Sequence, residues 1–252
     1  MTIHEGLTIT AADQLIALLE DGDVFRACTF DDADLRDLEA ERLEFEQCSF
    51  RKTDFANLSC QSFRVVNSNL EKARFDAADL HDAEFLDSVC TFASFRGAKL
   101  NQSRIVNCDL SSCNFDGANL FGADLSKSRL RAVDLTQANL DGTNLNHTNF
   151  GMASLRFKEF RRRKLVGISF TDADLSGCDF TGAEFDDCHL NGAILSEETM
   201  FDGADLRGAY ITDPLLDKAS LKGAIMSAPQ ASYLLSQRYG IIVADDAESL
   251  ST

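Results

Sequence analysis

The chain has 252 residues, of which 44% are hydrophobic and 26% are charged, a composition that excludes a disordered protein. Its 41 acidic residues outnumber 24 lysines and arginines, and the net charge of −17 argues against a protein held to nucleic acid by phosphate contacts. No apolar run is long enough for a membrane helix, and the N-terminus lacks the pattern of a signal peptide. We therefore expect a cytoplasmic protein with reduced cysteines and no membrane contact.

The first expected element is a short helix over residues 11–20, within an N-terminal cap that covers residues 1–22. Thr10 is placed to cap the start of this helix, with Asp13 three residues later. Gly22 is placed to stop it.

A five-residue repeat dominates residues 23–226. Every fifth position from Phe25 to Leu195 is apolar, and these 35 positions hold 14 of the 19 phenylalanines together with 16 leucines. The residue two positions earlier is mostly small, as in the consecutive segments 118–122 and 123–127. A period of five fits neither a helix nor an alternating strand, so it indicates a chain that turns a corner every five residues. One large and one small side chain then point inward from each segment.

This pattern resembles the pentapeptide-repeat family, whose fold is an all-β solenoid, a right-handed quadrilateral β-helix. In such a fold, four five-residue sides close one coil, and coils stack about 4.8 Å apart. The resemblance implies that Phe75, Phe95 and Phe115 lie in one ladder on one side of the β-helix. A stacked solenoid buries its core between neighbouring coils, so its two ends need caps.

The repeat has two small irregularities near its start. Leu38 and Leu43 take positions that are normally small, and Ala40 takes a large one. Cys60 and Phe63 likewise exchange sizes. We expect locally bulged coils at both places.

A larger irregularity is a basic segment at residues 156–164. Lys158 and Arg163 fall on small inward positions, where an unpaired charge is costly to bury. The segment is therefore expected to leave the β-helix as a lateral loop or to form a distorted side. It is either a solvated loop or a partner-binding loop, since loops on rigid scaffolds often carry function. Its basic residues are Arg156, Lys158, Arg161, Arg162, Arg163 and Lys164.

Near the C-terminus, the repeat continues with its register shifted by one residue, as Phe201 and Leu206 show. Residues 227–252 then form the expected C-terminal cap: a helix opened by Pro229 and ended by Gly240, a strand over 240–244 and a polar tail. Capping alone needs fewer apolar side chains than this segment carries, so we predict that it also forms a homodimer interface. The predicted interface residues are Tyr233, Leu234, Leu235, Ile241, Ile242 and Val243.

The sequence contains no pattern typical of catalysis. All eight cysteines fall on inward positions of the repeat and none has C-x-x-C spacing, so we interpret them as core residues. The four histidines are scattered, and no nucleophile, zinc or phosphate-binding motif is present. We predict a protein that is not an enzyme and has no cofactor or metal.

The end of the chain resembles the Qnr and MfpA proteins, within the pentapeptide-repeat family. The resemblance lies in residues 205–209, 213–216, 219–224 and 230–241. It implies a homodimer that binds DNA gyrase or topoisomerase IV as a DNA mimic, either inhibiting the enzyme or protecting it from quinolones or toxins. Such a mimic would not itself bind nucleic acid.

The charge is compatible with this interpretation. About ten coils would span roughly 48 Å, a length over which duplex DNA carries about 28 phosphate charges. Outside residues 156–164 the sequence has 40 acidic and 18 basic residues, a net charge of −22, which is of the same order. The alternative is an interaction scaffold whose partner docks on the basic segment or the N-terminal cap. A DNA mimic should carry its acidic residues continuously along one or two sides, whereas a scaffold need not.

Overall fold

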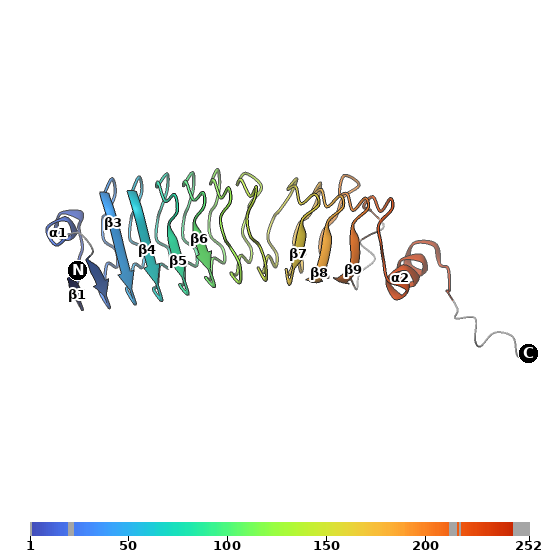
Figure 1. Ribbon diagram of the computed structural model, residues 1–252, viewed down its shortest axis with the longest axis horizontal. Helices are drawn as coiled ribbons and strands as arrows, with labels where there is room; N and C mark the ends of the chain where they lie inside the picture. Colours follow the sequence, from blue (N-terminus) through green and yellow to red (C-terminus); the bar gives the residue numbers. More distant parts are fainter. Residues whose placement is uncertain (1, 20–22, 212–215, 217, 244–252) are drawn as a thin grey trace, which may run out of the picture. The chain divides into compact units, whose positions relative to one another are not determined.

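The computed structural model describes residues 2–19, 23–211, 216 and 218–243, and it divides the chain into two compact units, Met1–Ser154 and Leu155–Thr252. Both units consist of stacked coils joined by parallel backbone pairing, the quadrilateral β-helix expected from the repeat. Figure 1 shows the successive coils and the short strands on them.

In the first unit, six strands form one parallel sheet in chain order. Phe25 pairs with Phe45, and Arg26 bonds Glu46 at a separation of 20 residues, which is one coil. Isolated parallel bridges such as Asp54 with Arg74 join the remaining sides. The strands are β1 (Ile3–Glu5), β2 (Val24–Arg26), β3 (Glu39–Glu46), β4 (Ser59–Val66), β5 (Glu84–Leu86) and β6 (Arg104–Val106).

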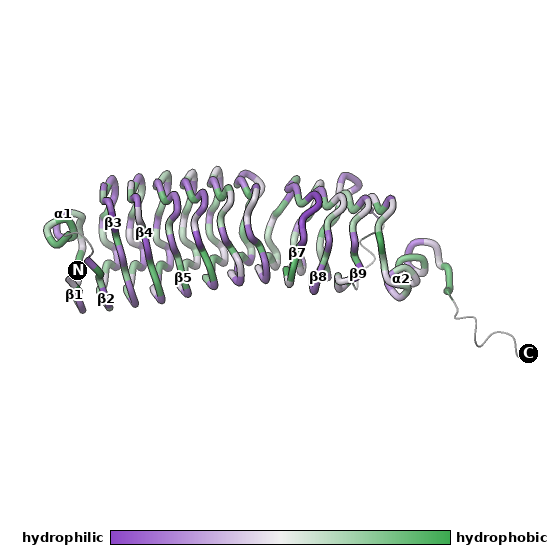
Figure 2. The backbone as a smooth tube through the Cα atoms, viewed as in Figure 1, coloured by the Kyte–Doolittle hydropathy of each residue, from purple (hydrophilic) through white to green (hydrophobic). Residues whose placement is uncertain are grey.

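Each full coil of the first unit has four sides, numbered here from residue 23. Side 1 is 23–27, side 2 is 28–32, side 3 is 33–37 and side 4 is 38–42, and each recurs at the interval of 20 residues. The first and third residues of most sides are buried and the others face outward, with exceptions such as Ala40, which is half-buried, and Val24, which is buried. Hydrophobic and hydrophilic residues therefore alternate along the coils (Figure 2).

The predicted phenylalanine ladder is confirmed on side 3. The ring centres of Phe75 and Phe95 are 5.2 Å apart with planes 3° from parallel, and Phe95 and Phe115 are also 5.2 Å apart. All three side chains are fully buried. Near-parallel stacking adds about 0.5–1.5 kcal/mol per pair to the gain from burial. The stacked rings therefore connect successive coils along side 3 of the first unit.

The expected bulges near residues 38–43 and 60–63 are absent. The chain instead runs straight through the corner between sides 4 and 1, giving the long strands β3 and β4 (Figure 1). Leu43 pairs directly with Phe63, and both are buried. The size exchange is accommodated because two adjacent coils make the same change and stay in register.

The N-terminal cap differs from the expectation. The helix α1 covers only Ala12–Ile16, and its N-cap is Ala11, without a side-chain hydrogen bond. Thr10 instead donates its backbone N–H to Gln14 Oε1 at 2.8 Å. Strand β1, which was not predicted, pairs with β2 and extends the β-helix into residues 1–22. The predicted stop at Gly22 lies outside the described residues.

The second unit contains a three-stranded parallel sheet and a C-terminal helix. Its strands are β7 (Lys164–Val166), β8 (Glu184–His189) and β9 (Asp205–Tyr210), and the helix α2 covers Ala228–Tyr239. The predicted shift of register is confirmed, because Asp179 is bridged to Met200, 21 residues later. Phe180 still stacks on Phe201, with ring centres 4.9 Å apart. One inserted residue is thus absorbed without loss of the aromatic stack.

Candidate interaction surfaces

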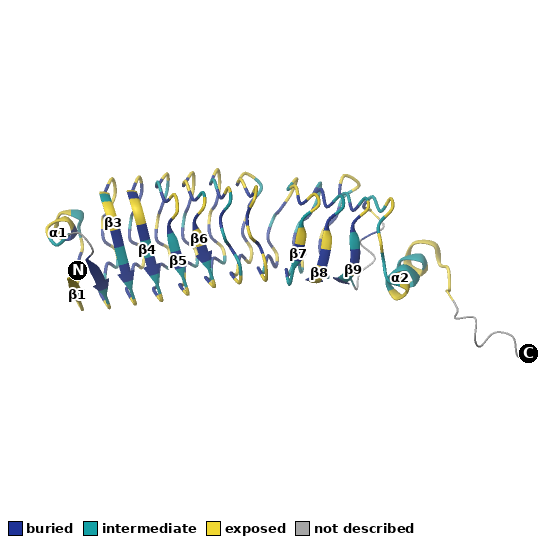
Figure 3. Cartoon of the chain, in the orientation of Figure 1, coloured by how far each residue is buried: buried dark blue, intermediate teal, exposed yellow. Residues whose placement is uncertain are grey.

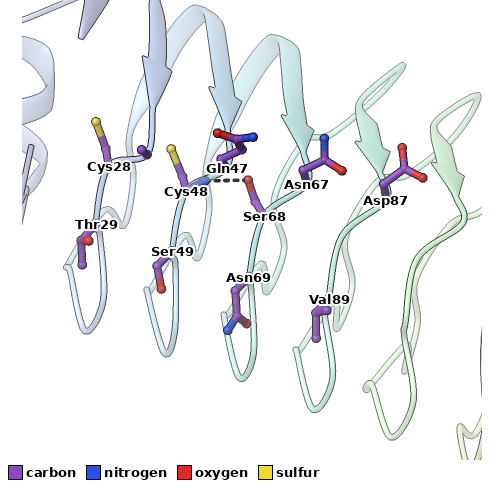
Figure 4. A pocket seen from close by; sticks show the side chains of 11 residues that line it. Cys28, Thr29, Gln47, Cys48, Ser49, Asn67, Ser68, Asn69, Asp87 and Val89 are labelled. Atoms are coloured by element: carbon purple, nitrogen blue, oxygen red, sulfur yellow. Dashed lines mark hydrogen bonds between the residues drawn. The ribbon is translucent and has the colours of Figure 1, made fainter. Parts of the chain in front are cut away.

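The first unit carries a shallow groove lined by cysteine and polar side chains (Figure 4). It has a volume of about 440 Å³ and runs along the corner between sides 1 and 2, past Cys28, Cys48 and Ser68. The backbone N–H of Cys48 donates to Ser68 Oγ at 3.0 Å. Burial raises the pKa of the Cys48 thiol to about 12, so at neutral pH it carries no thiolate and is a poor nucleophile.

The other cysteines fit the same interpretation. All eight are buried and unpaired, as core residues of the β-helix. Burial also raises the pKa of Cys178 to about 12. Among the described residues, no group of histidine, cysteine and acidic side chains is arranged to hold a metal ion. In the same part of the chain, no helix has the length and apolar character needed to cross a membrane.

Charge is distributed unevenly over the four sides of the first unit. On sides 3 and 4, acidic residues clearly outnumber basic ones. The acids there are Asp34, Asp37, Asp54, Asp76, Asp116, Asp134, Glu39, Glu41, Asp79, Asp82 and Asp141. The bases there are Arg36, Arg74, Arg96, Arg42 and Lys99. These two adjacent sides are called the acidic sides below.

On sides 1 and 2 the two signs are nearly balanced. The acids are Asp23, Glu44, Glu46, Glu84, Asp87, Asp124, Asp31, Asp32, Glu71 and Asp109. The bases are Arg26, Arg64, Arg104, Lys127, Arg51, Lys52, Lys72, Arg129 and Arg131. Many of these acidic and basic side chains form ion pairs between neighbouring coils, so their charges cancel locally.

A column on side 1 shows this pairing most clearly. Arg64 bonds Glu44 on the preceding coil, with 3.3 Å between Nε and Oε1, and also Glu84 on the following coil. Glu84 in turn accepts from Arg104 at 2.5 Å. The alternation of sign from coil to coil connects four coils, since each side chain reaches the next stacked one.

The acid sensitivity of the fold follows from such pairs. Burial opposes ionisation of Glu84, but hydrogen bonds from Arg104 and Arg64 outweigh it and hold its pKa below the usual value. A carboxyl group with a lowered folded pKa stabilises the protein above its unfolded pKa, near 4, and loses that contribution as the pH falls through the folded pKa. We therefore expect the melting temperature to drop steeply below about pH 4. Glu84→Gln should reduce this drop, whereas the exposed Asp141→Asn should leave it unchanged, as thermal denaturation across pH will show.

The basic segment 156–164 does not form the predicted lateral loop. Glu159 is bridged to Asp179, and residues 164–166 enter β7, so the segment follows the regular path of a coil. Lys158 and Arg163 do occupy inward positions, but both remain partly exposed. Arg163 also lies over the ring of Phe160, 5.6 Å from its centre. The charges are tolerated because neither is fully buried.

Acidic residues of the next coil contact several of the outward basic side chains. Arg161 lies 2.5 Å from Asp179, and Lys164 lies 3.5 Å from Asp186. Arg156 is 3.9 Å from Asp174. Arg162 is exposed at the corner before β7. The segment is thus a basic surface on a coil rather than a projecting loop.

The C-terminal helix α2 is formed as predicted at both ends. Ser227 and Gln230 make a reciprocal capping box, Pro229 lies in the first turn, and Gly240 ends the helix with φ of 64°. Gln230 Nε2 also donates to the backbone oxygens of Leu206 and Ala209, both at 2.8 Å. These bonds fix α2 to the last coils.

Most of the predicted interface residues are exposed: Tyr233, Ile241, Ile242 and Val243 are exposed, whereas Leu234 and Leu235 are half-buried. No residue of α2 is buried, which Figure 3 shows as a helix without the buried colour. The strand predicted over 240–244 is absent from its described part, 240–243. A strand needs a hydrogen-bonded neighbour, and no strand among the described residues pairs with 240–243. Ile242 is 89% exposed as a result.

The comparisons with known proteins agree with this architecture. The family of pentapeptide repeats matches in eight copies, over residues 64–102, 88–126, 123–156 and 168–213. No curated protein matches the sequence.

Two solved structures are similar. HetL, a pentapeptide repeat protein involved in the regulation of heterocyst differentiation in the cyanobacterium Nostoc sp. strain PCC 7120, is 23% identical, with a TM-score of 0.54 over 88% of this chain and 84% of HetL. QnrB1, a plasmid-mediated fluoroquinolone resistance protein, is 20% identical, with a TM-score of 0.49 over 96% of this chain and 99% of its own. At these identities the likeness concerns the fold. Since the matched repeats cover more than half of the sequence, the chain belongs to the pentapeptide-repeat family.

Proposed function

We propose that the protein is a non-catalytic binding protein whose acidic sides occupy a basic groove built for duplex DNA. The expected target is a type II topoisomerase, DNA gyrase or topoisomerase IV. The observation that carries this proposal is the excess of acidic residues on two adjacent sides of the first unit, next to two nearly neutral sides. Duplex DNA presents closely spaced negative charges to such a groove, and a rigid acidic surface competes for the same cations.

The proposal is tested by a supercoiling assay with purified gyrase, with and without a quinolone. The protein should inhibit supercoiling or change the action of the drug, and it should displace a labelled DNA duplex from the enzyme. Binding should weaken as salt rises, because exposed charges are screened over about 8 Å at physiological ionic strength. No effect on gyrase or topoisomerase IV, even at large excess, would contradict the proposal.

A second candidate is a scaffold for a partner that is not a topoisomerase. The ion pairs that connect coils on side 1 favour it, because they give Glu44 and Glu84 a role in stability rather than in binding. A scaffold of this kind would leave both topoisomerases unaffected.

We further propose that the binding form is a homodimer formed through α2 and residues 241–243. The support is the exposure of Tyr233, Ile241, Ile242 and Val243, next to a helix that buries none of its residues. A second copy would cover this apolar surface and supply the neighbour that an extended segment needs.

Replacing Ile242 with aspartate should therefore convert the protein from a dimer to a monomer. The charge would have to be buried against the second copy, which is costly without a partner. Sedimentation at micromolar concentration measures the change. Ile225→Asp is the matched control, because Ile225 is also exposed but lies on a coil, at the position where Asp205 lies one coil earlier. A wild-type protein that sediments as a monomer would refute the dimer.

A further inference from the structure

A second surface on the protein combines an exposed aromatic ring with arginines. Phe157 lies at a corner of the first coil of the second unit and is 56% exposed. Its ring packs over Gly177 on the next coil so closely that a Cβ at Gly177 would have no room. The guanidinium of Arg156 lies 5.5 Å from the centre of the ring. One face of a fixed aromatic ring is thus flanked by a cation.

The next corner of the same coil carries Arg161 and Arg162. Arg161 is held by Asp179, whose side chain is only 7% exposed, while 58% of the Arg161 side chain is exposed. Arg161 Nε donates a hydrogen bond to Asp179 Oδ2, and Arg161 Nη2 lies 2.5 Å from the same oxygen in an ion pair. Arg162 lies beside it and is also exposed. We call Arg156, Phe157, Arg161 and Arg162 the basic corner surface.

We propose that the basic corner surface binds an acidic segment of a partner protein, with carboxylates on the arginines and an apolar side chain on Phe157. A guanidinium that is already held in place binds a carboxylate at a lower cost in conformational entropy than a mobile one. An aromatic ring that is 56% exposed offers apolar surface to a second aromatic or aliphatic side chain. The surface consists of residues other than those of the acidic sides, and the proposal does not depend on their proposed use.

The surrounding charges favour a peptide over a nucleic acid. Glu159 lies between the two corners, and Asp174, Asp179 and Asp186 lie on the next coil. A nucleic acid strand carries a phosphate at every nucleotide and would meet these carboxylates. A peptide can place neutral side chains opposite them and acidic ones opposite the arginines.

The probe for this proposal is a short fluorescein-labelled peptide in which glutamates and serines alternate around one phenylalanine. Its binding to the full chain is measured by fluorescence anisotropy at low and physiological salt. A companion peptide has serine in place of the phenylalanine, and a single-stranded thymidine oligonucleotide of equal charge is the third probe.

The variants are chosen to preserve the fold. Phe157→Asn suits its φ of 60°, because asparagine already occupies the equivalent left-handed corner positions Asn57 and Asn107. Its matched control is Phe92→Asn, since Phe92 has the same φ and is 60% exposed on the first unit. The double variant Arg156→Gln with Arg162→Gln is matched by Arg96→Gln with Arg131→Gln, which removes the same charge elsewhere.

Phe157→Asn should weaken binding of the phenylalanine peptide about threefold or more and leave the serine peptide unchanged. The arginine double variant should weaken both peptides about tenfold, because charge-assisted contacts are lost. Both control variants should bind like the wild type. The proposal is overturned if the controls weaken binding as much, if the wild type binds neither peptide, or if the oligonucleotide binds more tightly than the phenylalanine peptide.

Discussion

Phe95→Ala will destabilise the protein by about 3–5 kcal/mol, the usual cost of removing a buried phenylalanine ring. Phe95 is fully buried and stacks between Phe75 and Phe115, each 5.2 Å away between ring centres. It also packs edge-to-face against Phe85, with ring centres 5.9 Å apart. Alanine would leave a cavity that the neighbouring coils cannot close, because their spacing is fixed by backbone hydrogen bonds on every side.

Chemical denaturation measures this loss, and Phe92→Ala provides the control. Phe92 is only three residues away, but its ring is 60% exposed at a corner. Its replacement should change the free energy of unfolding by no more than about 0.5 kcal/mol. Equal losses for the two variants would mean that the side 3 ladder does not hold the coils together.

The inward face of this fold could be predicted from the sequence because one rule repeats in every coil. A large residue every five positions, with a small one two positions before it, determined the burial of Phe75 and Phe95 as well as that of Cys113. The helix α2 was also predictable, since Ser227, Pro229 and Gly240 are local signals that act within the helix itself.

The N-terminal strand β1 was not predicted because residues 3–5 depart from the five-residue repeat. His4 takes the position of a large inward residue and stacks on Phe25, with ring centres 4.8 Å apart. Ile3 pairs with Val24, 21 residues later, so the register differs by one from the rest of the first unit. A polar ring and a shifted register together removed the signal that the period of five provides elsewhere.

The predicted loop at 156–164 failed for a different reason. The prediction assumed that an inward position is fully buried, so that Lys158 and Arg163 would force the chain outward. The structure leaves both partly exposed while their backbone keeps the ordinary turn bonds, Lys158 N–H to Leu155 O and Arg163 N–H to Phe160 O. The exposure of a side chain at an inward position depends on how the neighbouring coils pack, and the repeat pattern does not specify that packing. The repeat pattern does not identify the binding partner either, because a fold does not determine a function.

Reversing three charges on the acidic sides should weaken binding to the topoisomerase about a hundredfold. The variant is Asp37→Lys with Glu41→Lys and Asp82→Lys, all at exposed positions. Asp37 and Asp82 have positive φ, and lysine already occupies such corners at Lys52, Lys72 and Lys127, so the fold should persist. Each reversal changes the charge by two, and at about 0.5 kcal/mol per unit charge the sum is about 3 kcal/mol, or two orders of magnitude in affinity.

The matched control reverses Asp32, Glu71 and Asp87 to lysine on the nearly neutral sides. It changes the net charge by the same amount, and Asp32 and Asp87 also have positive φ. Competition with a labelled DNA duplex for gyrase, measured at several salt concentrations, compares the two. If the acidic sides occupy the DNA groove, the first variant loses both its affinity and its salt dependence, whereas the control keeps most of each. Equal losses would mean that only the net charge of the protein matters, and that no particular side faces the enzyme.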